Sequence, residues 1–194
     1  LYAITGLTHL LIEEEPNKSQ MEHLKSLKYS GDYLMNFIND ILQINKIEAD
    51  EVEPLKIEFQ LEKLLKEALE GIRVNAKKKG VNLQLHYDGA IPEKLLGDPA
   101  KLTQIFMNLL MNAEKFTKEG QIEIVAKIKK QDEKFVTVYF EVSDTGIGIS
   151  EEQQQYIFES FKQGSVQINR KYGGTGLGLT IVKSLLGLFN ININ

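Results

Sequence analysis

Cysteine is absent from this 194-residue sequence, which excludes disulfides, thiolate metal sites and a cysteine nucleophile. The same absence fits a reducing compartment. No apolar run approaches the roughly 18 residues of a membrane-spanning helix, and no signal-peptide pattern opens the chain. We therefore expect this segment to be soluble and cytoplasmic and to make no membrane contact, while its parent protein can still carry a membrane anchor.

Positive charge is also in short supply. The 23 lysines and arginines are outnumbered by 27 acidic residues, which gives a net charge of -4. This balance argues against a nucleic-acid partner, although it does not exclude a local basic groove. A hydrophobic fraction of 42% is sufficient for a buried core, and the length suits one large or two small domains.

Residues 1–49 are predicted to form a helical hairpin. The first helix ends before Pro16, and Asn17 or Ser19 can cap a second helix that runs to about Ala49. The apolar surface, with a heptad seam in the second helix, is too wide to be buried within one hairpin. We predict a homodimer in which two hairpins form a four-helix bundle; the alternative is a hairpin that docks on its own chain. The chain opens without an N-cap, so we interpret it as part of a longer protein.

Residues 50–194 follow a different pattern, after an acidic linker that ends at Pro54. Alternating apolar residues predict strands over 55–59, 81–87, 121–129 and 135–142. Apolar residues at helical spacing predict helices over 61–79, 100–116 and 177–188. This mixture predicts an α+β fold, a layered sandwich with the helices on one face of a mixed sheet.

Four glycines fall within residues 173–178 (GGTGLG), just before the last predicted helix. A backbone without Cβ atoms can approach a bulky ligand closely. A helix N-terminus offers unpaired N–H groups and a partial positive charge, which together suit a polyphosphate. Taken alone, the pattern fits a turn that merely joins two elements equally well.

Three polar residues, Asn108, Asn112 and Lys115, share one face of the predicted helix 100–116. Asparagine amides are costly inside a packed helix unless they find partners. Their oxygens suit Mg²⁺, which commonly bridges protein oxygens and nucleotide phosphates, and Lys115 lies close enough to reach the same phosphates. The alternative is that both amides serve as buried caps for neighbouring loops.

The strand 135–142 leads into Asp144, Gly146 and Gly148 in the sequence DTGIGI. An aspartate at a strand end can accept a hydrogen bond from an exocyclic amine, and the two glycines allow a flat base to lie against the backbone. The alternative is an ordinary Asp-Thr-Gly turn.

Two aromatic residues, Phe158 and Phe161, have the spacing of a clamp on a loop, although such pairs more often belong to a core. The segment 162–172 that follows is polar, lacks periodicity and carries three cations. It is predicted to be a lid that becomes ordered over a nucleotide, or else a solvated connector.

The order of these sites resembles that of the motifs of sensor histidine kinases. The matching stretches are 108–117 (NLLMNAEKFT) for the N box, 144–148 (DTGIG) for the first glycine box, 157–163 (IFESFKQ) for the F box and 170–179 (RKYGGTGLGL) for the second glycine box. The resemblance covers about residues 55–190. It implies the Bergerat fold of ATP-binding domains, which is shared with Hsp90-type chaperones, MutL-type repair proteins and type II topoisomerases.

The resemblance implies ATP and Mg²⁺ as cofactors. Asn112 would be the chief Mg²⁺ ligand with Asn108 assisting, and Asp144 would bind the adenine amino group. Lys115 would act with the two asparagines in catalysis and touch the phosphates. The other residues implied at the nucleotide are Gly146, Gly148, Ile149, Phe158, Phe161, Arg170, Lys171, Gly173, Gly174, Thr175, Gly176, Leu177 and Gly178.

The implied activity is transfer of the ATP γ-phosphate to a histidine, for relay to an aspartate on a response-regulator receiver domain. In hydrolysing members of the group a glutamate general base takes the place of Asn108, so its absence argues for phosphoryl transfer. The rival functions are an ATPase whose hydrolysis drives a conformational clamp, and a dimerisation module that uses nucleotide only as a structural ligand.

The resemblance also implies that residues 1–49 are a truncated dimerisation and phosphotransfer hairpin. None of His9, His23 and His86 is followed by the acid and proline of the His-Glu-x-x-x-Pro acceptor motif. We expect the acceptor roughly two turns before Leu1, so that this segment alone cannot label itself; the alternative is a kinase that has lost its histidine. The closing strands of the catalytic domain, residues 50–194, are expected to be incomplete.

Overall fold

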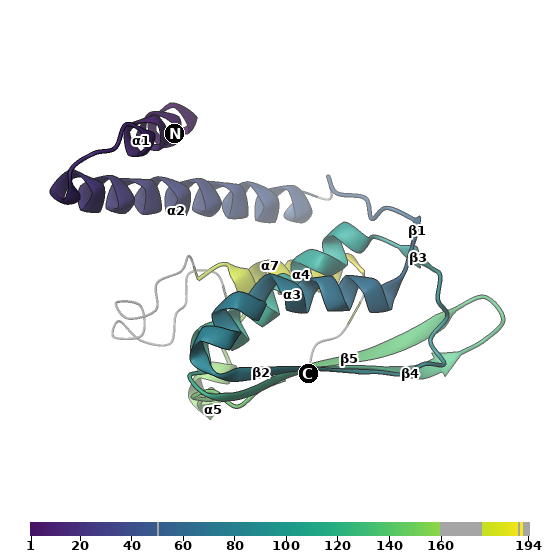
Figure 1. Cartoon of the computed structure of the whole chain (residues 1–194). Helices are drawn as coiled ribbons and strands as arrows, with labels where there is room; N and C mark the ends of the chain where they lie inside the picture. Colours follow the sequence, from purple (N-terminus) through teal and green to yellow (C-terminus); the bar gives the residue numbers. More distant parts are fainter. Residues whose placement is uncertain (50, 160–175, 190, 192–194) are drawn as a thin grey trace.

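The computed structural model describes residues 1–49, 51–159, 176–189 and 191. A helical hairpin lies above a layered body of helices and strands (Figure 1). In the body, α3 (Leu61–Lys79) and α4 (Pro99–Phe116) cover one face of a sheet, and α7 (Gly178–Leu188) packs beside α4. The predicted α+β sandwich is confirmed.

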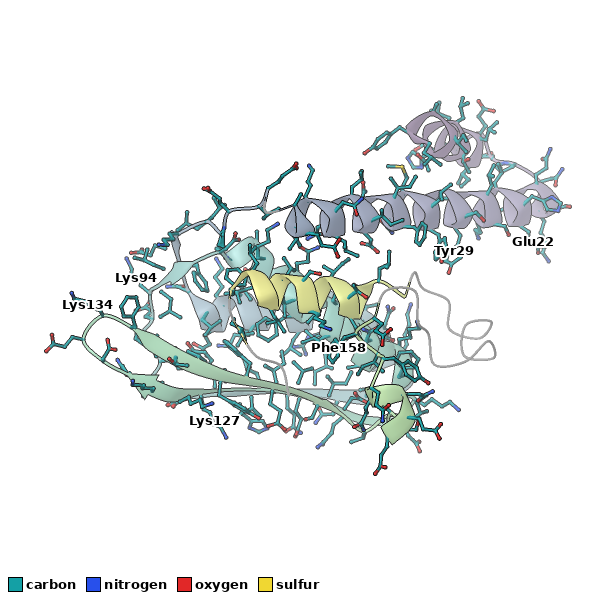
Figure 2. All side chains as sticks on the ribbon, turned by 180° about the vertical axis from the view of Figure 1, so that it is seen from behind. Glu22, Tyr29, Lys94, Lys127, Lys134 and Phe158 are labelled. Carbon is teal, nitrogen blue, oxygen red and sulfur yellow. The ribbon has the colours of Figure 1, made fainter. Side chains whose placement is uncertain are left out.

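The sheet consists of β2 (Val81–Tyr87), β4 (Gly120–Gln131) and β5 (Val136–Asp144), in the order β2-β4-β5. It is mixed, because β2 runs parallel to β4 and β5 runs antiparallel to it. Alternation along β4 decides which face is inside: Ile122 and Ile124 are fully buried under the helices. Lys127 projects from the opposite face, away from the helices (Figure 2).

A second, two-stranded sheet joins the start of the body to the segment before α4. Its strands are β1 (Ile57–Phe59) and β3 (Leu95–Gly97), paired antiparallel. Asp98 then caps α4 with a buried carboxylate, which accepts hydrogen bonds from the backbone N–H groups of Lys101 and Leu55, both at 3.0 Å. One N-cap therefore starts the helix and holds the linker from the hairpin.

The main core lies between α3, α4 and the inner face of the sheet. It includes Leu61, Leu65, Leu69, Phe106, Leu110, Ile122 and Ile124. The rings of Phe106 and Phe140 meet edge to face, with their centroids 5.2 Å apart. The apolar stripe of α3 ends at Gly80, whose φ of 72° gives the left-handed C-terminus that its sequence predicts.

The hairpin consists of α1 (Tyr2–Glu13) and α2 (Lys18–Glu48), which begins at Asn17 in a capping box. The two helices approach closely at Gly31, where a Cβ atom would lie 2.9 Å from Thr5 Cγ2. The half of α2 that carries Glu22 and Tyr29 extends beyond the body (Figure 2). Apolar side chains stay exposed along both helices, among them Leu7, Leu10, Leu11, Leu27, Leu34 and Leu42.

The other half of α2 docks on the body. Ile44 and Ile47 are buried in a cluster with Leu177, Ile181 and Leu185 at α7. Beside this cluster, the side-chain amides of Gln43 and Gln104 exchange two hydrogen bonds, of 2.7 and 2.6 Å. The alternative in which the hairpin docks on its own chain is therefore observed for this half of the helix.

No helix in the described part of the chain combines the length and the apolar character needed to cross a bilayer.

Two neighbouring residues of α4 test the assignment of the core. Leu110 is 0% exposed, whereas Met111 is 50% exposed. We expect Leu110→Ala to lower the free energy of unfolding by about 2–5 kcal/mol, because the cavity it leaves cannot close completely. Met111→Ala should cost well under about 1 kcal/mol. Chemical denaturation measures both, and equal losses would contradict this core.

Candidate functional site

The C-terminal half of α4, the end of β5 and the start of α7 meet at one end of the body (Figure 1). A glycine lies at each junction. A Cβ atom on Gly146 would lie 2.7 Å from the carbonyl oxygen of Phe116, and one on Gly178 would lie 3.2 Å from Oδ1 of Asn108. The first predicted motif, the second and the described end of the fourth therefore come together around α4.

The two asparagines are partly buried, one turn apart, on the side of α4 that faces the beginning of α7. The Cβ position of Gly178 lies 4.0 Å from Nδ2 of Asn112, in addition to its approach to Asn108. Among the described residues, no hydrogen bond holds either amide to a neighbouring loop. Both amides therefore lie beside the first residue of α7.

Lys115 lies further along α4 and is half-buried. Burial lowers the pKa of its ammonium group, and its Nζ lies 4.9 Å from the centroid of the Phe116 ring. Lys115 also lines a groove of about 510 Å³ between α3 and α4, next to the ion pair of Lys79 and Glu114 (2.7 Å). Neither asparagine lines this groove, which therefore lies apart from the contact between α4 and α7.

The carboxylate of Asp144 is held at the end of β5. Its Oδ1 accepts a hydrogen bond from the backbone N–H of Gly146 at 2.8 Å and one from the hydroxyl of Thr117 at 3.4 Å. Asp144 itself is exposed. The alternative of an Asp-Thr-Gly turn is thus partly supported, because the side chain of Asp144 accepts a hydrogen bond from the backbone N–H two residues later in the chain.

Thr145 fastens this turn to the start of β4. Its N–H donates to the carbonyl of Gln121 at 3.1 Å, and its hydroxyl accepts from the N–H of Gln121 at 3.0 Å. The hydroxyl also fills the space where Gly120 would carry a Cβ atom, at a φ of 105°. Sequence reasoning missed Thr117 and Thr145, although both lie inside the matching stretches, because a single hydroxyl has no periodic signal.

The remaining predicted residues differ in position. Gly148 and Gly176 have φ values of 69° and 73°, and Ile149 is exposed beside the first of them. Phe158 is partly buried on the segment after the short helix α5 (Glu151–Gln154) (Figure 2). The side chain of Leu177 is fully buried against α2, so only its backbone can face a ligand. Phe161, Arg170, Lys171, Gly173, Gly174 and Thr175 lie outside the described residues.

Residues 97–194 match the family described as histidine kinase-, DNA gyrase B-, and HSP90-like ATPase. The chain is 36% identical over 186 residues to the signal transduction histidine-protein kinase BarA of Escherichia coli (strain K12), covering 96% of this chain and 20% of BarA. It is 38% identical over 186 residues to the sensor histidine kinase GacS of Pseudomonas protegens, with the same coverage. The chain thus spans about a fifth of the length of these relatives.

Solved structures show the same likeness. The crystal structure of full-length ShkA in complex with AMPPNP has a TM-score of 0.80 at 30% identity, and the match covers 96% of this chain and 38% of ShkA. The Acinetobacter baumannii histidine kinase AdeS has a TM-score of 0.68 over 96% of this chain and 83% of AdeS. At 16% identity, this second likeness supports the fold alone.

Two glycines of α7 provide a matched test of the contact with α4. Gly178→Ala would bring a methyl group to 3.2 Å from Asn108 Oδ1, whereas Gly187→Ala has open space. We expect Gly178→Ala to displace Asn108 and to weaken Mg²⁺-ATP binding about tenfold in calorimetry, in line with typical overpacking costs. Gly187→Ala should leave this affinity unchanged and should stabilise the helix slightly. Unchanged affinity in both variants would remove Asn108 from the site.

Proposed function

Because this chain belongs to the histidine kinase-, DNA gyrase B-, and HSP90-like ATPase family, as a catalytic ATP-binding domain of the sensor histidine kinase type, we propose that its Mg²⁺-ATP lies where α4, β5 and α7 meet. We further propose that the parent protein transfers the γ-phosphate of that ATP to a histidine, for relay to a response-regulator receiver domain.

The observation that carries this proposal is the approach of Gly178 to Asn108 and Asn112. Two amide side chains and the first turn of a helix then face the same space. A helix N-terminus favours phosphate, and amide oxygens are ligands that Mg²⁺ accepts. Among the described residues no cluster of His, Cys, Asp or Glu could hold a metal ion by itself. In this proposal the amide oxygens of Asn108 and Asn112 would hold the metal together with phosphate oxygens.

Each end of the nucleotide has a candidate partner. Asp144, fixed by Gly146 N–H, would accept a hydrogen bond from the adenine amino group. Lys115 would touch the phosphates, and their negative charge would raise its depressed pKa, which favours the charged form of the amine. Phosphoryl transfer requires mainly positioning and charge neutralisation, and Mg²⁺, when bound, supplies much of that neutralisation.

Residues 1–49 and 50–194 would have separate roles. The second segment binds and positions the nucleotide. The first would be the remnant of a dimerisation and phosphotransfer hairpin, and its exposed apolar side chains support a second copy of this chain as its partner. None of its histidines follows the acceptor pattern. His9 is exposed on α1, with its Nε2 3.3 Å from Oε1 of Glu13.

The transfer reaction is tested on the protein extended upstream of Leu1 by the sequence of its parent. Incubation with γ-labelled ATP and Mg²⁺ should give a label on the protein that acid removes and alkali spares, as expected of phosphohistidine. Asn112→Ala should abolish the label. Release of inorganic phosphate without any labelled protein would instead favour the clamp ATPase, and binding without either product would favour a structural nucleotide.

Calorimetry on the same variant separates metal binding from folding. Asn112→Ala should weaken binding of Mg²⁺-ATP about tenfold or more, and should change binding in the presence of a chelator much less. Asn82→Ala, on an exposed position of β2, is the control and should change neither value. Equal losses with and without the metal would assign Asn112 a structural role.

The dimer is tested on the exposed apolar side chains of α2, which include Leu27, Leu34, Ile38 and Leu42. Leu34 is 42% exposed, and Asn36 is exposed on the same helix. Light scattering should give the wild-type chain a mass of twice its 22.0 kDa. Leu34→Asp should yield monomers, because it places a charge in the apolar interface, whereas Asn36→Asp should remain dimeric. A monomeric wild-type chain would refute this arrangement.

A further inference from the structure

We propose that Thr117 is a positioning residue that orients the carboxylate of Asp144 for recognition of the adenine amino group. This inference rests on the proposed binding of ATP at the junction of α4, β5 and α7. It concerns the selectivity of the site for its base and assigns a role to a side chain outside the predicted set.

Thr117 is held by a backbone hydrogen bond and by the burial of its side chain. It is the C-cap of α4, where its N–H donates to the carbonyl of Ala113 at 2.9 Å, and its side chain is 0% exposed. An apolar side chain would fill this place without the cost of burying a hydroxyl. The hydroxyl instead donates to Oδ1 of Asp144, at 3.4 Å.

Oδ1 of Asp144 has a second donor, the N–H of Gly146 at 2.8 Å. Gly146 has no room for a Cβ atom at this contact. The Cβ position of Gly146 lies between Oδ1 of Asp144 (2.6 Å) and the carbonyl oxygen of Phe116 (2.7 Å), so the turn is pressed against the end of α4. One donor lies at the end of α4 and the other in the turn after β5. Because both bind the same oxygen, they restrict rotation of the Asp144 carboxylate.

Oδ2 of Asp144 makes no hydrogen bond within the described residues, and Asp144 is exposed. With Oδ1 held by Thr117 and Gly146, Oδ2 is the oxygen that can accept a hydrogen bond from a ligand. The exocyclic amine of adenine is a hydrogen-bond donor, whereas a purine base with only a C–H group at that position has no donor there. Loss of the Thr117 hydroxyl should therefore weaken recognition of the amine selectively.

The experiment compares two nucleotides that differ by one group. Calorimetry with Mg²⁺-ATP and with Mg²⁺-purine riboside triphosphate, which lacks only the 6-amino group, is carried out on the wild type, Thr117→Val and Thr117→Ser. A well-formed O–H···O bond is about 2.7 Å long, so the longer contact here predicts a moderate effect. We expect valine to weaken ATP binding about fivefold to tenfold and to change binding of the analogue less than about twofold. Serine should restore both values.

Thr137→Val, on an exposed position of β5, is the matched control and should leave both affinities unchanged. If Thr117→Val melts below the assay temperature, the affinities for the two nucleotides are measured on Thr117→Ala in its place. Equal losses for the two nucleotides, or no recovery with serine, would overturn the role of Thr117. A wild-type chain that binds neither nucleotide would instead refute the proposed function, so the two failures are distinguishable.

Discussion

The site depends on two places where a backbone lies against α4 with no room for a Cβ atom. Gly146 rests on the carbonyl of Phe116, and Gly178 rests on the amide of Asn108. Protein interiors are packed as densely as organic crystals, so a larger residue at Gly146 would have to separate the turn from α4, and one at Gly178 would have to shift the side chain of Asn108. The positions of the asparagines of α4, the carboxylate of β5 and the start of α7 relative to one another therefore depend on the absence of a side chain at Gly146 and Gly178.

The elements with local signals are those that sequence analysis predicts well. The helix over 61–79 and the strand over 81–87 agree with the structure to the residue, because the apolar periodicity changes abruptly at Gly80. β4 extends beyond both of its predicted ends, since pairing between the strands continues past a register shift near Ile128, whereas β5 begins one residue later and ends two residues later than predicted. The predicted strand over 55–59 contains β1, but its pairing with β3 had no local signal, because the three residues of β3 carry too little alternation to be recognised.

For the candidate site, the sequence predicted which motifs lie together but not every contact between them. Motif order indicated that Asn108, Asp144 and Gly178 belong to one pocket, and the contacts of α4 bring them to the same end of the body. Spacing alone did not reveal that Thr117 contacts Asp144, since this pairing arises from a helix end and a strand end that are distant in sequence. It also did not reveal that the side chain of Leu177 faces α2, because the sequence left open whether the hairpin docks on its own chain or on a second copy.

The burial of Leu177 has a mechanical consequence. This side chain precedes Gly178 and shares an apolar cluster with Ile44 and Ile47 of α2. If a nucleotide binds at the start of α7 as proposed, a rotation of α2 about its axis would act on that site through this cluster, in which Leu177 is the residue next to Gly178. Such a coupling would be reciprocal, so that nucleotide binding would bias the rotation of α2 by the same coupling free energy.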